Sequence, residues 1–252
     1  MDGAAGRLHS AGAPLCIDGE MAYIRLQGTQ APPERRDGQR RNSFMIELYT
    51  WSTPNGRKVS IALEELGLEY NTHSINIMED EQFAPDFLKV APNNRIPAIV
   101  DTDTGQSLME SGAILLYLAE KTGQLMPKDA EGRWRTIEWL MWQMGGPGPM
   151  LGQAHHFIHF NPDKSEYAAE RYRNEGKRLY GVLDRRLEGR DFVAGDYSIA
   201  DISIWPWISR FEWQTIDMKE FPRVRDWYVR IAERPAVQRG YVVPNAQDIP
   251  MP

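Results

Sequence analysis

Three short stretches of this chain carry polar side chains and backbone groups that can recognise a small ligand. The first is the turn at residues 53–56, Thr-Pro-Asn-Gly, which joins a strand-like run at residues 46–49 to a helix-like run at residues 57–66. A strand that leads directly into a helix leaves backbone N–H groups without partners, and these groups attract anions. The turn is therefore a candidate anion site.

The other two stretches are Ile96-Pro97 and Glu110-Ser111. A proline before a core strand is a candidate for a cis bond in a tight turn, and the Ile96 backbone could then face outward and pair with an extended peptide. Ser111 as a helix cap would leave N–H groups for a carboxylate, while Glu110 can bind an ammonium group. Each feature alone is common for structural reasons, but together the three stretches converge on one small acidic peptide.

Redox enzymes often place a cysteine at such a turn, yet the only cysteine of the chain, Cys16, lies far upstream. A single cysteine excludes an internal disulfide and a cysteine-rich zinc site, and it fits a reducing compartment. A thiol that works at this turn must therefore come from another molecule.

The composition is that of a globular protein, with 42% hydrophobic and 25% charged residues among 252. A net charge of −6 weighs against a nucleic-acid partner, although it leaves room for local basic patches. No apolar run reaches the roughly 18 residues that span a bilayer, and no signal-type stretch begins the chain. We therefore expect a cytoplasmic protein with no membrane partner.

Residues 45–125 predict an α/β domain, and residues 133–240 predict an all-helical domain. The expected strands of the first are residues 46–49, 70–77, 98–100 and 107–109, and its expected helices are residues 57–66, 85–90 and 111–122. In the second, a tryptophan-rich helix is broken by residues 145–149, and helices follow from about residue 166 to 187, from residue 198, and finally at residues 222–233. Ser198 and Asp201 predict a capping box, and Pro206 predicts a kink.

Residues 1–44 and 241–252 fall outside both domains. The first 44 residues are rich in Gly, Ala, Pro and Arg, so they cannot bury enough apolar surface to offset the entropy of ordering. We expect a disordered N-terminal extension, with Met45 as the native start and a targeting or interaction arm as the alternative. Residues 241–252 are expected to form a C-terminal tail.

Four motifs together resemble the glutathione transferase family: residues 53–56, residues 93–101 (NNRIPAIVD), residues 110–118 (ESGAILLYL) and residues 197–201 (YSIAD). More narrowly, residues 145–153 (GGPGPMLGQ) and 155–157 (HHF) resemble the bacterial Nu-class enzymes that act as glutathione-dependent disulfide-bond oxidoreductases. The match covers roughly residues 45–240. The resemblance implies a thioredoxin-like domain packed on an all-α domain, a homodimer, and glutathione as co-substrate without a metal.

The resemblance also implies which residues act. Thr53 and Asn55 would contact the glutathione sulfur, Ile96 would hold the cysteinyl backbone, and Glu110 with Ser111 would bind the γ-glutamyl head.

Two further residues match family positions that meet the other end of glutathione. Gln82 would lie near the glycyl end, and Arg171 would reach a glutathione carboxylate from the helical domain. Pro97, Ser198 and Asp201 are expected to be structural.

Simple energetics support a role for Thr53 in stabilising the glutathione thiolate. A hydrogen bond to a charged group contributes roughly 1.5–3 kcal/mol, and a helix N-terminus adds about 0.3–1 kcal/mol. At about 1.36 kcal/mol per pKa unit, these effects lower a thiol pKa from about 8.5 to near 5.5–7. Tyr49 is the competitor, because other classes of the family use a tyrosine hydroxyl, but it sits inside the first strand.

The chemistry expected is reduction of a small disulfide by bound glutathione thiols. One alternative is conjugation of glutathione to an electrophile, in which case Met150, Phe157 and Trp207 would line an apolar pocket; otherwise they belong to the core. The other is a non-catalytic glutathione-binding scaffold. His155 and His159 would share a helix face, but no acidic partner lies between them, so we expect them to be structural rather than metal ligands.

Overall fold

Four strands form one mixed sheet in the order β2-β1-β3-β4 in the computed structural model, which describes residues 45–252. They are β1 (Met45–Thr50), β2 (Glu69–Ser74), β3 (Ala98–Asp101) and β4 (Gln106–Met109). Strands β1 and β2 are parallel, whereas β3 pairs antiparallel with both β1 and β4. The expectations for residues 1–44, including the extension, Cys16 and the start at Met45, lie outside the described residues.

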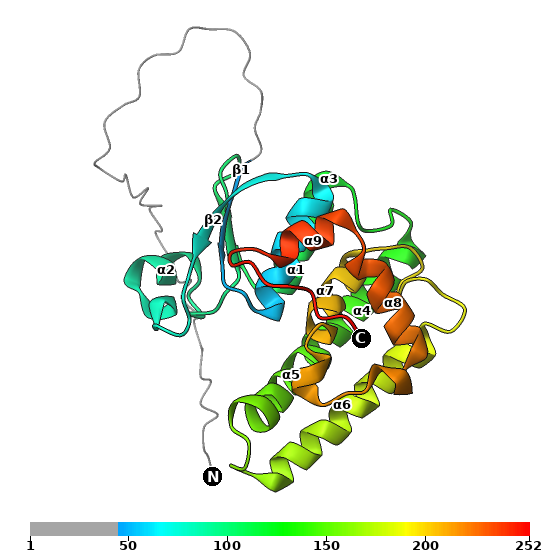
Figure 1. Cartoon of the computed structure of the whole chain (residues 1–252). Coiled ribbons are helices and arrows are strands. Elements are labelled where there is room, and N and C mark those ends of the chain that lie inside the picture. Colours follow the sequence, from blue (N-terminus) through cyan, green and yellow to red (C-terminus); the bar gives the residue numbers. More distant parts are fainter. Residues whose placement is uncertain (1–44) are drawn as a thin grey trace, which may run out of the picture. The chain divides into compact units, whose positions relative to one another are not determined.

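Helices cover both faces of this sheet (Figure 1). They are α1 (Pro54–Leu66), α2 (Pro85–Val90) and α3 (Ser111–Thr122), and a single turn of 3₁₀ helix precedes α2 at Glu81–Phe83. Because side chains alternate along a strand, Leu48 and Ile99 join the core that contains α1 and α3. Their neighbours Tyr49 and Ala98 point the other way and pack with Phe87 of α2.

The second strand is shorter than residues 70–77 because its partner ends. The Ile75 N–H donates to the Thr50 carbonyl oxygen at 3.0 Å, and β1 stops at that residue as the chain enters the turn at residues 51–53. Ile75 then packs against the α2 cluster rather than continuing the sheet. The prediction of strand up to residue 77 was therefore wrong.

The rest of the described chain is helical apart from its connections and its C-terminal end. Its helices are α4 (Ala130–Gly145), α5 (Pro147–Ala154), a π-helical turn (His155–Phe160), α6 (Glu166–Arg186), α7 (Ile199–Ile208), short 3₁₀ turns (Phe211–Gln214 and Met218–Glu220), α8 (Pro222–Ala232) and α9 (Pro235–Tyr241). The expected break falls at Gly146, between α4 and α5. The fold class of an α/β part followed by an all-α part is confirmed.

Helix α7 lies at the centre of the helical part, and all ten of its residues are buried. Its first turn has the expected capping box of Ser198 and Asp201. The buried Asp201 carboxylate also accepts hydrogen bonds from the Val193 N–H at 3.0 Å and the Trp227 indole at 2.9 Å. Asp201 therefore ties the start of α7 to α8.

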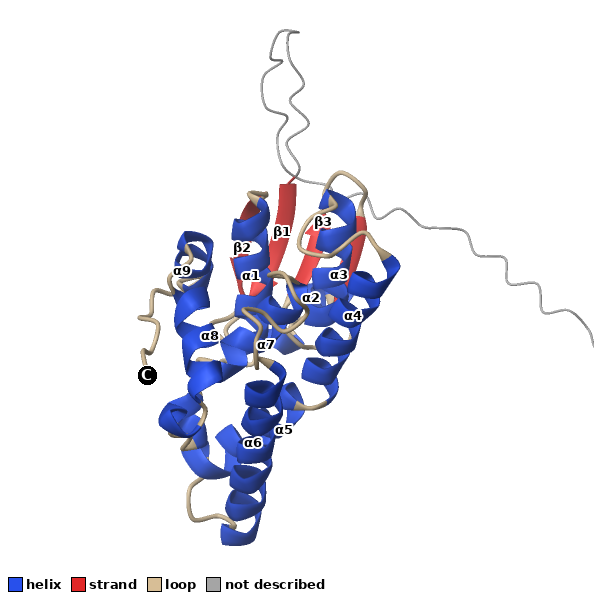
Figure 2. Ribbon diagram, turned by 90° about the vertical axis from the view of Figure 1, so that its right-hand side faces the viewer, coloured by secondary structure: helices blue, strands red, loops and turns tan. Residues whose placement is uncertain are grey.

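Helix α9 was not predicted from the sequence, in which the last expected helix covered residues 222–233. It lies beside α1 in both views (Figures 1 and 2). The Ser60 hydroxyl donates to the Gly240 carbonyl oxygen at 2.7 Å, and a Cβ on Gly240 would come within 2.6 Å of the Ile61 backbone. Glycine at residue 240 is what allows the two helices to approach so closely.

Candidate functional site

The turn at residues 53–56 forms the start of α1, with Thr53 as its N-cap. The Thr53 hydroxyl oxygen accepts a hydrogen bond from the Gly56 N–H at 3.1 Å, so its own proton is free to donate elsewhere. No acidic side chain occupies the first turn of α1, and the positive end of the helix is therefore not neutralised. A Cβ on Gly56 would lie 2.2 Å from the Trp51 carbonyl oxygen, which explains glycine at this position.

Two adjoining cavities, which we together call the binding groove, lie over this turn. The first, of about 250 Å³, is lined by Thr53, Pro54, Asn55, Ile77, Gln82, Asn94, Arg95, Ile96 and Trp207. The second, of about 260 Å³, is lined by Asn55, Asn93, Arg95, Ile96, Pro97, Met109, Glu110 and Ser111. Because Asn55, Arg95 and Ile96 line both cavities, the two form one elongated groove. It brings together every sequence-predicted ligand residue except Arg171.

The backbone that lines the middle and one end of the groove has uncommon conformations. The Ile96-Pro97 bond is cis, as the sequence predicted. Asn94 and Glu110 have φ angles of 47° and 69°, in the left-handed region that non-glycine residues rarely adopt. Strained backbone of this kind collects at binding sites, where the surrounding structure enforces it.

Glu110, not Ser111, is the N-cap of α3, and Ser111 is the first residue of that helix. The predicted capping role of Ser111 was therefore wrong. Its hydroxyl is buried and instead accepts a hydrogen bond from the Lys58 ammonium group at 3.2 Å. The physical reason is the position of α1, which brings a long donor side chain beneath the start of α3.

Lys58 is a buried cation that the sequence analysis missed. Its side chain is 0% exposed and donates to the Gln143 Oε1 atom at 2.6 Å as well as to Ser111. Burial lowers the pKa of Lys58 to about 7, and the negative charge of Glu110 opposes that shift. Helical spacing was the available signal, since residue 58 lies one turn beyond Asn55 on the same face of α1.

Asn55 is held from the helical part of the protein. Its Oδ1 atom accepts a hydrogen bond from the Trp207 indole at 3.0 Å, and Trp207 also lines the groove. Of the other expected pocket residues, Met150 lines a different cavity and Phe157 stacks on Tyr172 with 5.7 Å between ring centroids.

Gln82 lies at the opposite end of the groove from Ser111 and is buried. Its Nε2 atom donates to the Asp80 carboxylate at 3.3 Å. Within residues 45–252 its Oε1 atom has no hydrogen-bond partner. A buried acceptor without a partner is costly, so a ligand N–H at this end would be stabilised.

Tyr49 does not line the groove. It stacks on His73 with 4.5 Å between ring centroids and packs against Phe87 on the α2 face of the sheet. Burial, followed by the charge of Glu47, raises the pKa of its hydroxyl. The geometry therefore favours Thr53 over Tyr49 as the donor to an anion at the turn.

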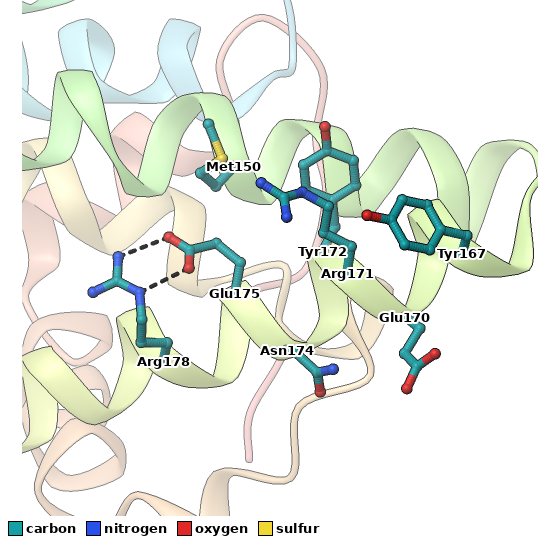
Figure 3. Close-up of a pocket in the computed structure, with 8 residues that line it drawn as sticks. All are labelled: Met150, Tyr167, Glu170, Arg171, Tyr172, Asn174, Glu175 and Arg178. Atoms are coloured by element: carbon teal, nitrogen blue, oxygen red, sulfur yellow. Dashed lines mark hydrogen bonds and ion pairs between the residues drawn. The ribbon is translucent and has the colours of Figure 1, made fainter.

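Arg171 lies on α6 in a separate cavity of about 570 Å³ (Figure 3). The same cavity contains Glu175 and Arg178, which form an ion pair at 2.7 Å. Figure 3 shows the Arg171 guanidinium directed toward Met150. The hydrogen bond from Arg178 lowers the pKa of the Glu175 carboxyl most, and the nearby charge of Arg171 lowers it further. A single chain therefore does not bring Arg171 to the groove.

The histidines near α5 belong to an aromatic cluster. His155 is 6% exposed and stacks on Trp207, and His159 stacks on Trp213 with 4.2 Å between ring centroids. In the part of the chain that is described, no group of three His, Cys, Asp or Glu side chains is placed to hold a metal ion. None of the helices between residues 45 and 252 is both long and apolar enough to cross a membrane.

Two family models match this chain. The model of the N-terminal domain of glutathione S-transferases matches residues 45–120, and the model of the C-terminal domain matches residues 148–235. The chain belongs to the glutathione transferase family. The family and the architecture predicted from the motifs are thus confirmed.

Relatives of this glutathione transferase include two proteins of Escherichia coli K12. The disulfide-bond oxidoreductase YfcG is 50% identical over 198 residues, which cover 76% of this chain and 92% of YfcG. The disulfide-bond oxidoreductase YghU is 43% identical over 215 residues, which cover 79% of this chain and 74% of YghU.

Solved structures of the family show the same fold with glutathione present. A Burkholderia graminis glutathione transferase with two glutathione molecules bound per subunit has a TM-score of 0.76 and 46% identity, over 79% of this chain and 88% of its own. A Pseudomonas putida transferase with one glutathione disulfide bound per subunit has a TM-score of 0.77 and 45% identity, over 82% of this chain and 94% of its own.

Proposed function

We propose that this transferase reduces small disulfides with the thiols of bound glutathione rather than with cysteines of its own. The observation that carries the proposal is the start of α1, where the Thr53 hydroxyl and an uncompensated helix N-terminus face the groove and no cysteine follows Cys16. The names of the two Escherichia coli relatives and the disulfide bound to the Pseudomonas putida structure support it.

Each of the six predicted ligand residues that line the groove has a role in this proposal. Thr53 and the Asn55 amide donate hydrogen bonds to the sulfur, and the Ile96 backbone pairs with the cysteinyl residue. Glu110 binds the ammonium group of the γ-glutamyl head, and Ser111 with the α3 N-terminus binds its carboxylate. Gln82 offers its free acceptor near the glycyl end.

The reaction proceeds in two exchange steps. The bound thiolate attacks one sulfur of the substrate disulfide, which forms a glutathione mixed disulfide and releases the first substrate thiolate. A second glutathione thiolate then attacks the glutathione sulfur of the mixed disulfide, which forms glutathione disulfide and releases the second substrate thiolate. Both released thiolates take protons from water. Holding the reacting thiols close together supplies the rate advantage.

A homodimer accounts for the position of Arg171, which faces a cavity outside its own groove. We propose that the partner's Arg171 meets a glutathione carboxylate across the interface. A cytoplasmic location, where glutathione is abundant and reduced, fits this chemistry. The domain boundaries at residues 45–125 and 133–240, and the tail at residues 241–252, complete the proposed organisation.

The test compares Thr53→Ala with Thr53→Ser in the purified full-length protein. Turnover of bis(2-hydroxyethyl) disulfide with glutathione should fall about tenfold to a hundredfold in Thr53→Ala, which loses a hydrogen bond to a charged group. Thr53→Ser keeps the hydroxyl and should retain most activity, and Cys16→Ser should retain all of it.

Full activity of Thr53→Ala would contradict the assignment of the sulfur site. Faster turnover of an aryl halide than of the disulfide would instead establish conjugation as the main reaction. Binding of glutathione without turnover of either substrate would establish a scaffold.

A further inference from the structure

The amide of Asn55 is oriented by a partner that can only donate. Its Oδ1 atom accepts from the Trp207 indole N–H at 3.0 Å. An indole nitrogen has no acceptor capacity, so this contact fixes which end of the amide is the oxygen and which is the NH₂ group. The NH₂ group makes no hydrogen bond within residues 45–252, and Asn55 lines both cavities of the groove.

Trp207 is itself held rigidly. Its side chain is 8% exposed and lies in the fully buried helix α7, where its ring stacks on His155 at 5.6 Å with 19° between the ring planes. The backbone carbonyl oxygen of Trp207 accepts from the Gln214 amide at 2.8 Å. The indole N–H thus has little freedom to leave Asn55.

A buried hydrogen-bond network holds Gln214 and His155, two residues that contact Trp207. The Gln214 NH₂ group lies 3.0 Å from the His155 Nε2 atom, and the Tyr180 hydroxyl donates to the Gln214 oxygen at 2.7 Å. His155 must accept this bond and is therefore neutral, in agreement with the burial that lowers its pKa to about 4. Every donor and acceptor of the Gln214 amide is directed toward a partner, so the network has one arrangement.

We propose that Trp207 is a positioning residue, which turns the NH₂ group of Asn55 toward the sulfur of bound glutathione. The inference deepens the proposed function and rests on it. Its consequence is that the thiolate site, formed by a turn of the α/β part, is completed by a helix of the all-α part. Without the indole N–H, the Asn55 amide should be free to rotate. Its oxygen could then face the thiolate, and the two negative groups would repel each other.

The experiment compares Trp207→Phe, Asn55→Ala and the double variant, with Trp213→Phe as the matched control. Trp213 also contacts His155, at 5.4 Å between ring centroids, but it makes no contact with Asn55 through its indole nitrogen. The readouts are the pKa of the bound glutathione thiol, followed by its ultraviolet absorbance, together with kcat and KM for disulfide reduction. Thermal melting shows whether each variant is folded.

We expect Trp207→Phe to raise the thiol pKa and to lower kcat about threefold to tenfold, the range for one hydrogen bond, while Trp213→Phe changes neither. In the Asn55→Ala background, Trp207→Phe should have no further effect on the thiol pKa, because its only route to the sulfur is Asn55.

An unchanged thiol pKa in Trp207→Phe would overturn the positioning role, as would an equal shift in the Asn55→Ala background, which would indicate a purely structural effect. These outcomes are distinct from failure of the proposed function. If the proposed function is wrong, wild-type protein would not bind glutathione, or would bind it with the thiol pKa of free glutathione.

Discussion

The two ends of the binding groove are supported in different ways. At the proposed sulfur end, Thr53 and Asn55 are held by neutral hydrogen bonds, one from the Gly56 backbone and one from the Trp207 indole. At the proposed γ-glutamyl end, Ser111 is held by the buried cation Lys58, which lies on α1 one turn beyond Asn55. Helix α1 therefore supports both ends, but with groups of different electrical character.

This difference matches what each end must do. Thr53 and Asn55, which we propose to contact the sulfur, carry no titratable group near neutral pH, so the charge that develops there is that of the ligand thiol. The head group of glutathione instead carries fixed charges, and we propose Glu110 and the start of α3 as their partners. Lys58 gives this end a group whose pKa, about 7, lies near neutral pH. The sulfur end should thus be insensitive to protein titration, while the head end should respond to pH.

The largest effect should come from adding a methyl group to the backbone at the sulfur end. Gly56→Ala would place a Cβ 2.2 Å from the Trp51 carbonyl oxygen, which cannot move without opening the turn. We expect a loss of about 3 kcal/mol in the free energy of unfolding and loss of disulfide reduction. Urea unfolding and a turnover assay measure the two effects.

Gly112→Ala is the matched change at the other end. Its Cβ would meet the flexible side chain of Met144 at 3.1 Å, and alanine is favoured over glycine in a helix by about 1 kcal/mol. Stability should therefore change little. Equal destabilisation by both changes would show that the two ends are equally rigid and would contradict the difference between them.

A smaller effect is expected when the cation beneath the head end is removed. Lys58→Met keeps an unbranched side chain one atom shorter than lysine but leaves Ser111 and Gln143 without their donor. KM for glutathione should rise about threefold to tenfold, the range for one or two hydrogen bonds, with kcat nearly unchanged. A fall in kcat with constant KM would instead place Lys58 in the support of the sulfur end.

The last effect concerns the dependence of stability on pH. The pKa of Lys58 is lower in the folded protein, about 7, than its ordinary value of 10.5. Between these values the unfolded chain binds the proton and the folded chain does not, so the contribution of Lys58 to stability rises with pH from about 7 upward. Urea unfolding at several pH values should show this rise in the wild type and a flatter curve in Lys58→Met. Identical curves would show that Lys58 stays charged when buried.

The sequence was a good guide to the elements and to the local motifs. Periodicity and turn chemistry located β1, the cis bond at Ile96-Pro97 and the capping box of Ser198 and Asp201, because each depends on neighbouring residues. The same local reasoning placed Thr53 and Asn55 in one turn at the start of a helix.

What the sequence did not reveal depends on residues far apart in the chain. Strand β2 stops at Ser74 because its partner β1 ends, and α9 was missed because its seven residues are fixed by close packing on α1. The bonds from Lys58 to Ser111 and from Trp207 to Asn55 join positions 53 and 152 residues apart. No pattern in a single sequence states such pairings, and they emerge only when the helices are packed.

The proposed reaction requires that two glutathione sulfurs lie together beside Thr53. A crystal structure of this protein soaked with glutathione disulfide tests that requirement most directly. We expect both sulfurs within hydrogen-bonding reach of the Thr53 hydroxyl and the Asn55 amide, with one γ-glutamyl head at Glu110 and Ser111. A disulfide bound elsewhere, or a single glutathione facing an open apolar pocket, would contradict it.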